Sequence, residues 1–106
     1  MNKENIATIS QYMPGIYPPG EDDIATHLLA GLYIKSCADA DPEIAKRYNV
    51  ITFDFATTLD HQEVVSKVSQ YHPKFVAYSL YMWNYHEFVE SSSLLKKMDP
   101  NLCVVV

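Results

Sequence analysis

The side chains best suited to binding chemistry follow the apolar segment 75–78. They are Ser79, Tyr81, Trp83 and Asn84, and a helical pattern resumes after them. In an open parallel sheet, ligands bind at the carboxyl ends of the strands. Aromatic rings offer flat apolar surface there, while hydroxyl and amide groups bond to polar atoms at a ligand's rim. This loop is therefore typical of a site for a flat cofactor.

The histidines and cysteines do not form a second group with the spacing of a functional site. Cys37 and Cys103 fall in an expected helix and an expected core strand, far apart and without a C-x-x-C motif, so we expect buried, inert thiols. Helix packing, capping or solvation explains each histidine. The histidines are His27, His61, His72 and His86. The spacing therefore predicts no catalytic residue and no metal ligand.

Charge and hydropathy exclude several classes of protein. Thirteen acidic and eight basic residues give a formal charge of −5. Lysine and arginine form no cluster beyond Lys46-Arg47 and Lys96-Lys97, so nucleic-acid binding is not expected. No apolar segment reaches the roughly 18 residues that span a bilayer, and residues 1–5 lack the pattern of a signal peptide. We therefore expect a cytoplasmic protein without a membrane span.

Segments typical of strands alternate with segments typical of helices. Strands are expected over 6–13, 50–55, 75–79 and from 102, and helices over 23–37, 43–48, 60–72 and 84–98. Helix starts are marked by Asp41-Pro42, by Asp60 with Glu63, and by Asn84 with Glu87. Apolar strands joined by helical crossovers predict one domain over 1–106, a three-layer Rossmann-like (flavodoxin-like) parallel α/β sheet flanked by helices.

Packing expectations follow from the same periodicity. The first long helix is expected to bury a broad face, and the last helix a narrower one. Their buried residues would be Ile24, Leu28, Leu29, Leu32, Tyr33 and Ile34 in the first, and Phe88, Leu95 and Met98 in the last. The run 102–106 has the composition of a buried strand in which the chain stops. We therefore expect a truncated module whose exposed last strand pairs in a homodimer.

Motifs of the commoner nucleotide-binding folds are missing from the loops. The first loop has only Gly15 and Gly20 where a dinucleotide site needs G-x-G-x-x-G, and the sequence contains no G-K-[ST]. The expected strand ends also lack the acidic residues of a phosphoacceptor receiver domain. The loops therefore match none of these three families.

Several segments, with the order of the elements, resemble the N-terminal cobalamin-binding domain of cobalamin-dependent radical SAM enzymes. These segments are Met13-Pro14-Gly15, residues 23–33, Tyr78-Ser79-Leu80-Tyr81-Met82-Trp83-Asn84 and the closing run 96–106. The resemblance covers nearly the whole chain. It implies that the corrin lies across the carboxyl edge of the sheet and that the nucleotide tail enters the domain.

The resemblance also implies which residues contact the cofactor. They are Pro14, Gly15, Ile16 and Tyr17 after the first strand, Thr57 after the second, and Ser79, Leu80, Tyr81, Met82, Trp83 and Asn84 after the third. The D-x-H-x-x-G motif of other cobalamin modules is missing, since Asp60 and His61 are adjacent. No histidine from that motif would therefore bind the cobalt.

The family resemblance further implies a longer parent enzyme. A downstream radical SAM domain would hold a [4Fe-4S] cluster and S-adenosylmethionine, and the parent would be a methyltransferase or a relative of the magnesium-protoporphyrin monomethyl ester cyclase. This chain has no Cx3Cx2C motif, so it is not expected to catalyse that chemistry alone. The alternative is a flavodoxin-like interaction domain without a cofactor, in which Tyr81-Met82-Trp83 docks a partner protein.

Overall fold

Strands and helices alternate along the chain, as the sequence predicts. A computed structural model describes residues 3–13 and 29–106. Its elements are β1 (Glu4–Tyr12), α2 (Leu29–Ala40), α3 (Pro42–Arg47), β2 (Tyr48–Ala56), α4 (His61–Ser69), β3 (Phe75–Tyr78), the 3-10 helix η1 (Met82–Asn84), α5 (Tyr85–Met98) and β4 (Cys103–Val105). The expected start of the first long helix lies outside the described residues.

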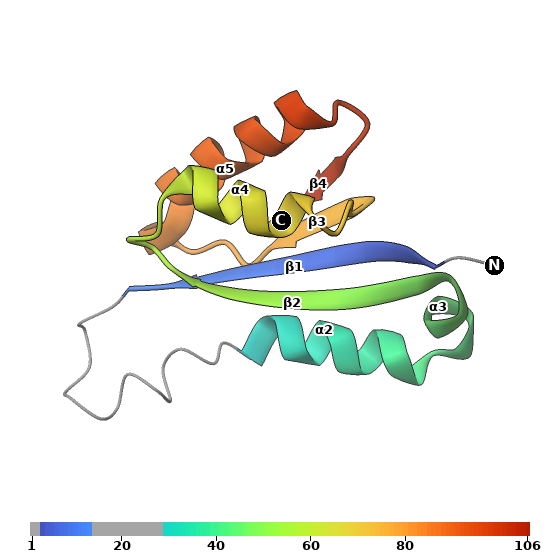
Figure 1. Cartoon of the computed structure of the whole chain (residues 1–106). Helices are drawn as coiled ribbons and strands as arrows, with labels where there is room; N and C mark the ends of the chain where they lie inside the picture. Colours follow the sequence, from blue (N-terminus) through green and yellow to red (C-terminus); the bar gives the residue numbers. More distant parts are fainter. Residues whose placement is uncertain (1–2, 14–28) are drawn as a thin grey trace.

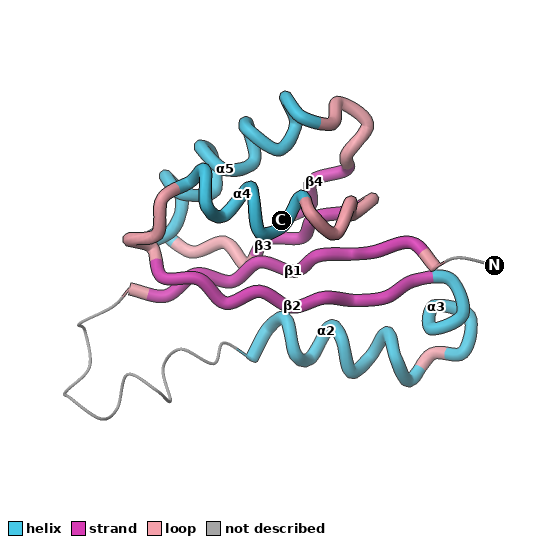
Figure 2. The backbone as a smooth tube through the Cα atoms, in the orientation of Figure 1, coloured by secondary structure: helices cyan, strands magenta, loops and turns pink. Residues whose placement is uncertain are grey.

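The strands form one parallel sheet in the order β2-β1-β3-β4 (Figures 1 and 2). β1 is central and pairs with β2 on one side and β3 on the other. This arrangement confirms the predicted parallel α/β fold of the Rossmann-like type. It also brings the carboxyl ends of β1, β2 and β3 to the same edge of the sheet.

The hydrophobic core lies between the sheet and the helices α4 and α5. It is built from alternate residues of the strands, which point to one face, and from valines and leucines of the helices. Its members include Ala7, Ile9, Val64, Val68, Val76 and Leu95. α2 lies on the other face, against β1 and β2 (Figure 1). The sheet is therefore covered on both faces over β1 and β2.

Helix starts follow the predicted capping chemistry in two places. Asp41 Oδ1 accepts from the backbone N–H groups of Glu43 and Ile44 at 2.9 and 3.3 Å, and Pro42 opens α3. Asp60 Oδ1 accepts from the Gln62 N–H at 2.7 Å at the start of α4. Both caps satisfy amide groups that have no partner within the helix.

The prediction of a broad buried face on α2 is wrong for the predicted residues whose burial the structure describes. Leu32, Tyr33 and Ile34 are exposed, whereas Gly31 is buried. A Cβ atom added to Gly31 would lie 2.7 Å from Thr8 Oγ1. The helix contacts the sheet closely at this glycine. The larger side chains of Leu32, Tyr33 and Ile34 remain exposed.

Three further burial predictions are also wrong. Met98 is exposed at the end of α5, although Leu95 is buried and Phe88 packs against the core as expected. Cys37 and Cys103 are both exposed. Cys103 lies opposite Phe75 in the strand pairing, so its side chain points to the face of the sheet away from α4 and α5. On that face α2 covers only β1 and β2, which leaves Cys103 exposed.

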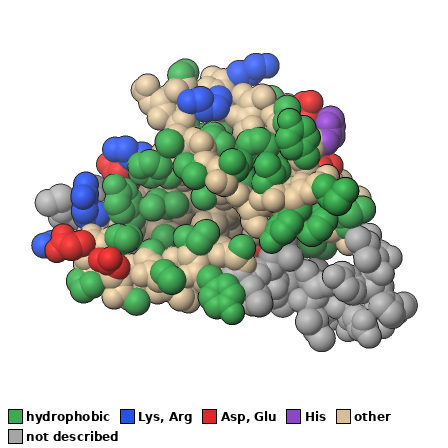
Figure 3. Space-filling view, turned by 180° about the vertical axis from the view of Figure 1, so that it is seen from behind, with side chains coloured by type: hydrophobic (Ala, Val, Ile, Leu, Met, Phe, Trp, Pro, Cys, Tyr) green, Lys and Arg blue, Asp and Glu red, His purple; other side chains and the backbone are tan. Residues whose placement is uncertain are grey.

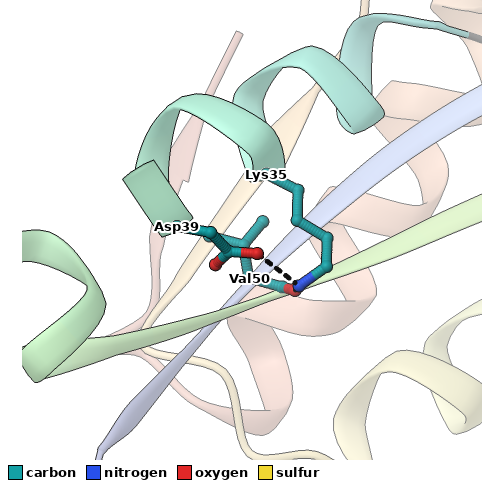
Figure 4. A network of polar contacts seen from close by, with 3 residues as sticks. All are labelled: Lys35, Asp39 and Val50. Carbon is teal, nitrogen blue, oxygen red and sulfur yellow. Dashed lines mark hydrogen bonds and ion pairs between the residues drawn. The ribbon is translucent and has the colours of Figure 1, made fainter. Parts of the chain in front are cut away.

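A lysine of α2 reaches a backbone carbonyl of the edge strand β2 (Figure 4). Lys35 Nζ donates to the Val50 carbonyl at 3.1 Å and pairs with Asp39 Oδ2 at 3.2 Å. Charged side chains on edge strands prevent pairing with another chain. β2 is therefore a poor site for strand addition.

Tyr78 should make stability fall at alkaline pH. Burial raises its pKa from 10.0 to about 12, although the hydrogen bond with Ser91 lowers it. The folded protein thus retains a proton that the unfolded chain releases above pH 10, so this contribution is complete below pH 10 and is lost as pH rises toward 12. We expect a loss of about 2–3 kcal/mol over that range.

Urea unfolding at several pH values, compared with Tyr78→Phe, measures this contribution. The variant should be less stable by about 1 kcal/mol at neutral pH, because the 2.6 Å bond to Ser91 Oγ is lost. Its alkaline decline should be shallower than that of the parent chain. Equal slopes would show that Tyr78 does not titrate in this way.

Candidate functional site

The loops after β2 and β3 are attached to the carboxyl half of β1. The Thr57 N–H donates to the Tyr12 carbonyl at 2.9 Å, and the Ser79 N–H donates to the Ile9 carbonyl at 2.9 Å. Trp83 Nε1–H donates to the Gln11 carbonyl at 3.1 Å. The indole N–H thus bonds to a carbonyl of β1 that faces β3 but lies past the end of that strand. This bond holds the loop at the edge of the sheet.

Asn84 fixes the shape of the loop from inside. Its side chain is fully buried, with 0% exposure. Oδ1 accepts from the Tyr81 N–H at 2.7 Å, and Nδ2–H donates to the Ser79 carbonyl at 2.8 Å. Asn84 occupies the N-cap position of α5, but its side chain makes no capping bond. The prediction that Asn84 caps this helix is therefore wrong. Its side-chain amide instead bonds to the backbone of the preceding loop.

Tyr81 and Trp83 form a stacked aromatic pair on this loop, in which each ring covers one face of the other. Their rings are stacked, with centroids 4.5 Å apart and planes inclined by 5°. They remain 46% and 42% exposed, and Met82 between them is 93% exposed. Leu80 is also exposed. The structure therefore brings the predicted residues 79–84 together as a rigid loop with an accessible aromatic face.

A small cavity lies between α2, β1 and β3, next to this loop. Its volume is about 130 Å³. It is lined by Thr8, Ile9, Ser10, Ala30, Gly31, Ile34, Ala77, Tyr78 and Ser79. Thr8 is 3% exposed, and its buried Oγ1 has no hydrogen-bond partner among the described residues. The cavity can thus accept a group that forms a hydrogen bond.

The sequence analysis missed Gln11 as a candidate site residue. Its side chain is buried at the end of β1, and Oε1 has no partner in the described part of the chain. A lone glutamine in an expected strand gives no signal of this, because burial there depends on the helices packed against it. Thr57 lies half-buried after β2. Pro14, Gly15, Ile16 and Tyr17 lie outside the described residues.

The described residues offer little metal chemistry. Within 3–13 and 29–106, no group of three or more His, Cys, Asp or Glu side chains could hold a metal ion. In the same ranges, no helix is both long and apolar enough to cross a membrane. The arrangement is suited to binding a flat molecule through stacking and hydrogen bonds.

No family model matches the chain, and no curated protein matches it. The fold and the loop define the class of protein, a parallel α/β domain with a stacked aromatic pair at the carboxyl edge of its sheet.

Proposed function

We propose that this chain is a cobalamin-binding module of a B12-dependent radical SAM enzyme. The observation that carries the proposal is the stacked Tyr81–Trp83 pair at the carboxyl edge of the sheet. A corrin presents a broad apolar face, and burial of such a face against aromatic rings is favourable. The clamp by Asn84 presents the pair as a preformed surface, which lowers the ordering cost of binding.

In this proposal the cavity beside the loop receives one group of the nucleotide tail, because its volume of about 130 Å³ is too small for the whole tail. Ser79 of the loop lines the cavity, and the Thr8 hydroxyl, which has no hydrogen-bond partner among the described residues, would bond to a polar atom of that group. Gly31 leaves space there that any Cβ would reduce. Bound cobalamin would supply the cobalt chemistry, while this chain's residues bind and orient it. The [4Fe-4S] cluster and S-adenosylmethionine belong, in this proposal, to a downstream domain of the parent methyltransferase or cyclase.

Calorimetric and absorbance titrations with two corrinoids test the proposal. Hydroxocobalamin should bind saturably at one molecule per chain. Cobinamide, which lacks the nucleotide tail, should bind about tenfold more weakly or worse, because the cavity contacts are lost. Equal affinities would exclude the cavity as the tail site, and absence of binding by both would refute the cobalamin proposal.

A second candidate is a protein-interaction domain, favoured by the exposed apolar surface. Leu80, Tyr81, Met82 and Trp83 are all exposed on one loop. Hydrophobic side chains also spread across the middle of the face in Figure 3, with charged ones toward its margins. Such surfaces mark contacts with other proteins. Failure to bind any corrinoid would favour this candidate.

We also propose that two copies of the chain pair through β4. The Cys103 N–H donates to the Lys74 carbonyl at 3.1 Å, so the backbone groups of Cys103 face β3 and those of Val104 face outward. Antiparallel pairing centred on Val104 would let the two copies exchange N–H···O bonds. On the opposite edge of the sheet, Lys35 already occupies the Val50 carbonyl of β2 and disfavours pairing there.

Cross-linking tests this pairing. Centring on Val104 places Cys103 opposite Val105 of the partner as a non-hydrogen-bonded pair, with Cα atoms about 4.5 Å apart, within disulfide range. In a Cys37→Ser background, Val105→Cys should give a disulfide-linked dimer on a non-reducing gel. Val106→Cys points to the other face and should not. Equal cross-linking of the two variants would contradict the proposed register.

A further inference from the structure

Two histidine side chains from different helices meet at the functional edge of the sheet. His61 is the first residue of α4 and His86 the second of α5. Their ring centroids are 5.7 Å apart, and the ring planes are inclined by 66°. His86 is exposed and His61 half-buried, so the pair is open to solvent. Figure 1 shows that α4 and α5 begin on the same side of the molecule.

The spacing of the rings suits shared coordination of one metal ion. With metal–nitrogen bonds of about 2.0–2.1 Å, two imidazoles on a tetrahedral ion would hold their centroids roughly 5 Å apart. Small side-chain rotations close the difference from 5.7 Å. Within the described ranges, neither ring has a hydrogen bond or ion pair that would have to break.

Acidic side chains near the two rings offset the positive charge of the helix ends. Helix amino termini carry partial positive charge, which opposes a metal ion. Glu63 and Glu87 lie in the first turns of α4 and α5 and offset that charge. No third side chain completes a ligand group among residues 3–13 and 29–106, so water or a substrate would fill the other coordination positions.

We propose that His61 and His86 bind one divalent transition ion of the Zn²⁺, Ni²⁺ or Cu²⁺ class. Neutral imidazole is a preferred ligand for these ions. The proposed ion site does not depend on cobalamin binding. Because two protein ligands leave coordination positions open, the ion would exchange readily with chelators.

Calorimetric titration with Ni²⁺ tests the site, because this ion favours imidazole and does not oxidise the exposed thiols. The background carries His27→Gln, since His27 lies outside the described residues. His61→Ala and His86→Ala should each weaken binding about tenfold or more, because each turns a two-point contact into one. His72→Ala, at the far end of α4, is the matched control and should bind as the background does.

Paramagnetic broadening separates loss of the site from loss of folding. Substoichiometric Ni²⁺ should broaden the ring C–H signals of His61 and His86 in the folded background protein, and leave those of His72 sharp. Unchanged affinity in either single variant, or equal broadening at His72, would overturn the proposal.

Discussion

Replacement of Asn84 by alanine is expected to lower the free energy of unfolding by about 2–4 kcal/mol. The side chain is fully buried and makes hydrogen bonds of 2.7 and 2.8 Å to the backbone of Tyr81 and Ser79. Alanine would leave that N–H and that carbonyl, both partly buried, without this partner, at a cost of up to about 1–3 kcal/mol each. Urea denaturation monitored by circular dichroism measures the loss.

Asn101→Ala is the matched control for this substitution. Asn101 is exposed, so its replacement should change stability by no more than about 0.5 kcal/mol. Asn84→Asp keeps an acceptor for the Tyr81 N–H but places a buried carboxylate against the Ser79 carbonyl, so at neutral pH it should be at least as destabilising as alanine. A change in Asn84→Ala as small as in the control would contradict the role given to this clamp.

Replacement of Trp83 by alanine is expected to weaken hydroxocobalamin binding by about tenfold to a hundredfold. The variant loses a ring that is stacked on Tyr81 at 4.5 Å, together with the bond from Nε1 to the Gln11 carbonyl. Both the contact surface and its attachment to β1 would therefore be lost. Calorimetric titration of the variant beside the parent chain gives the ratio of affinities.

Two further variants distinguish loss of the aromatic contact with the corrin from loss of the indole bond to β1. Trp83→Phe keeps an aromatic face but has no N–H, so its affinity should lie between those of the parent and the alanine variant. Met98→Ala removes an exposed apolar side chain at the other end of α5 and should leave affinity unchanged. Equal affinities of the parent chain and Trp83→Ala for hydroxocobalamin would show that the aromatic pair is not part of the binding site.

The sheet and the helix starts could be predicted because their signals are local. Apolar runs such as 75–78 identify a buried strand, and Asp41 or Asp60 before a helical pattern identifies its cap. The parallel direction of the strands follows from the helical crossovers between them, whereas the order β2-β1-β3-β4 is known only from the structure. These features need no knowledge of which helix packs where.

Burial and the internal structure of the site could not be predicted in the same way. The exposed side of α2 depends on the close approach of Gly31 to Thr8, which is a contact between distant segments. Asn84 has the sequence signature of a cap, and only the loop geometry shows that its amide bonds backward instead. The meeting of His61 with His86 likewise depends on how α4 and α5 begin side by side.

The most direct test of cobalamin binding uses the single tryptophan of the chain. Its indole N–H gives one side-chain cross-peak in a ¹⁵N-correlated spectrum, and hydroxocobalamin is diamagnetic. Addition of hydroxocobalamin should shift that peak saturably, together with the backbone amides of Tyr81 and Asn84, and leave the amide of Met98 unmoved. An indole peak that stays in place at excess hydroxocobalamin would contradict the proposal that the corrin lies on the aromatic pair.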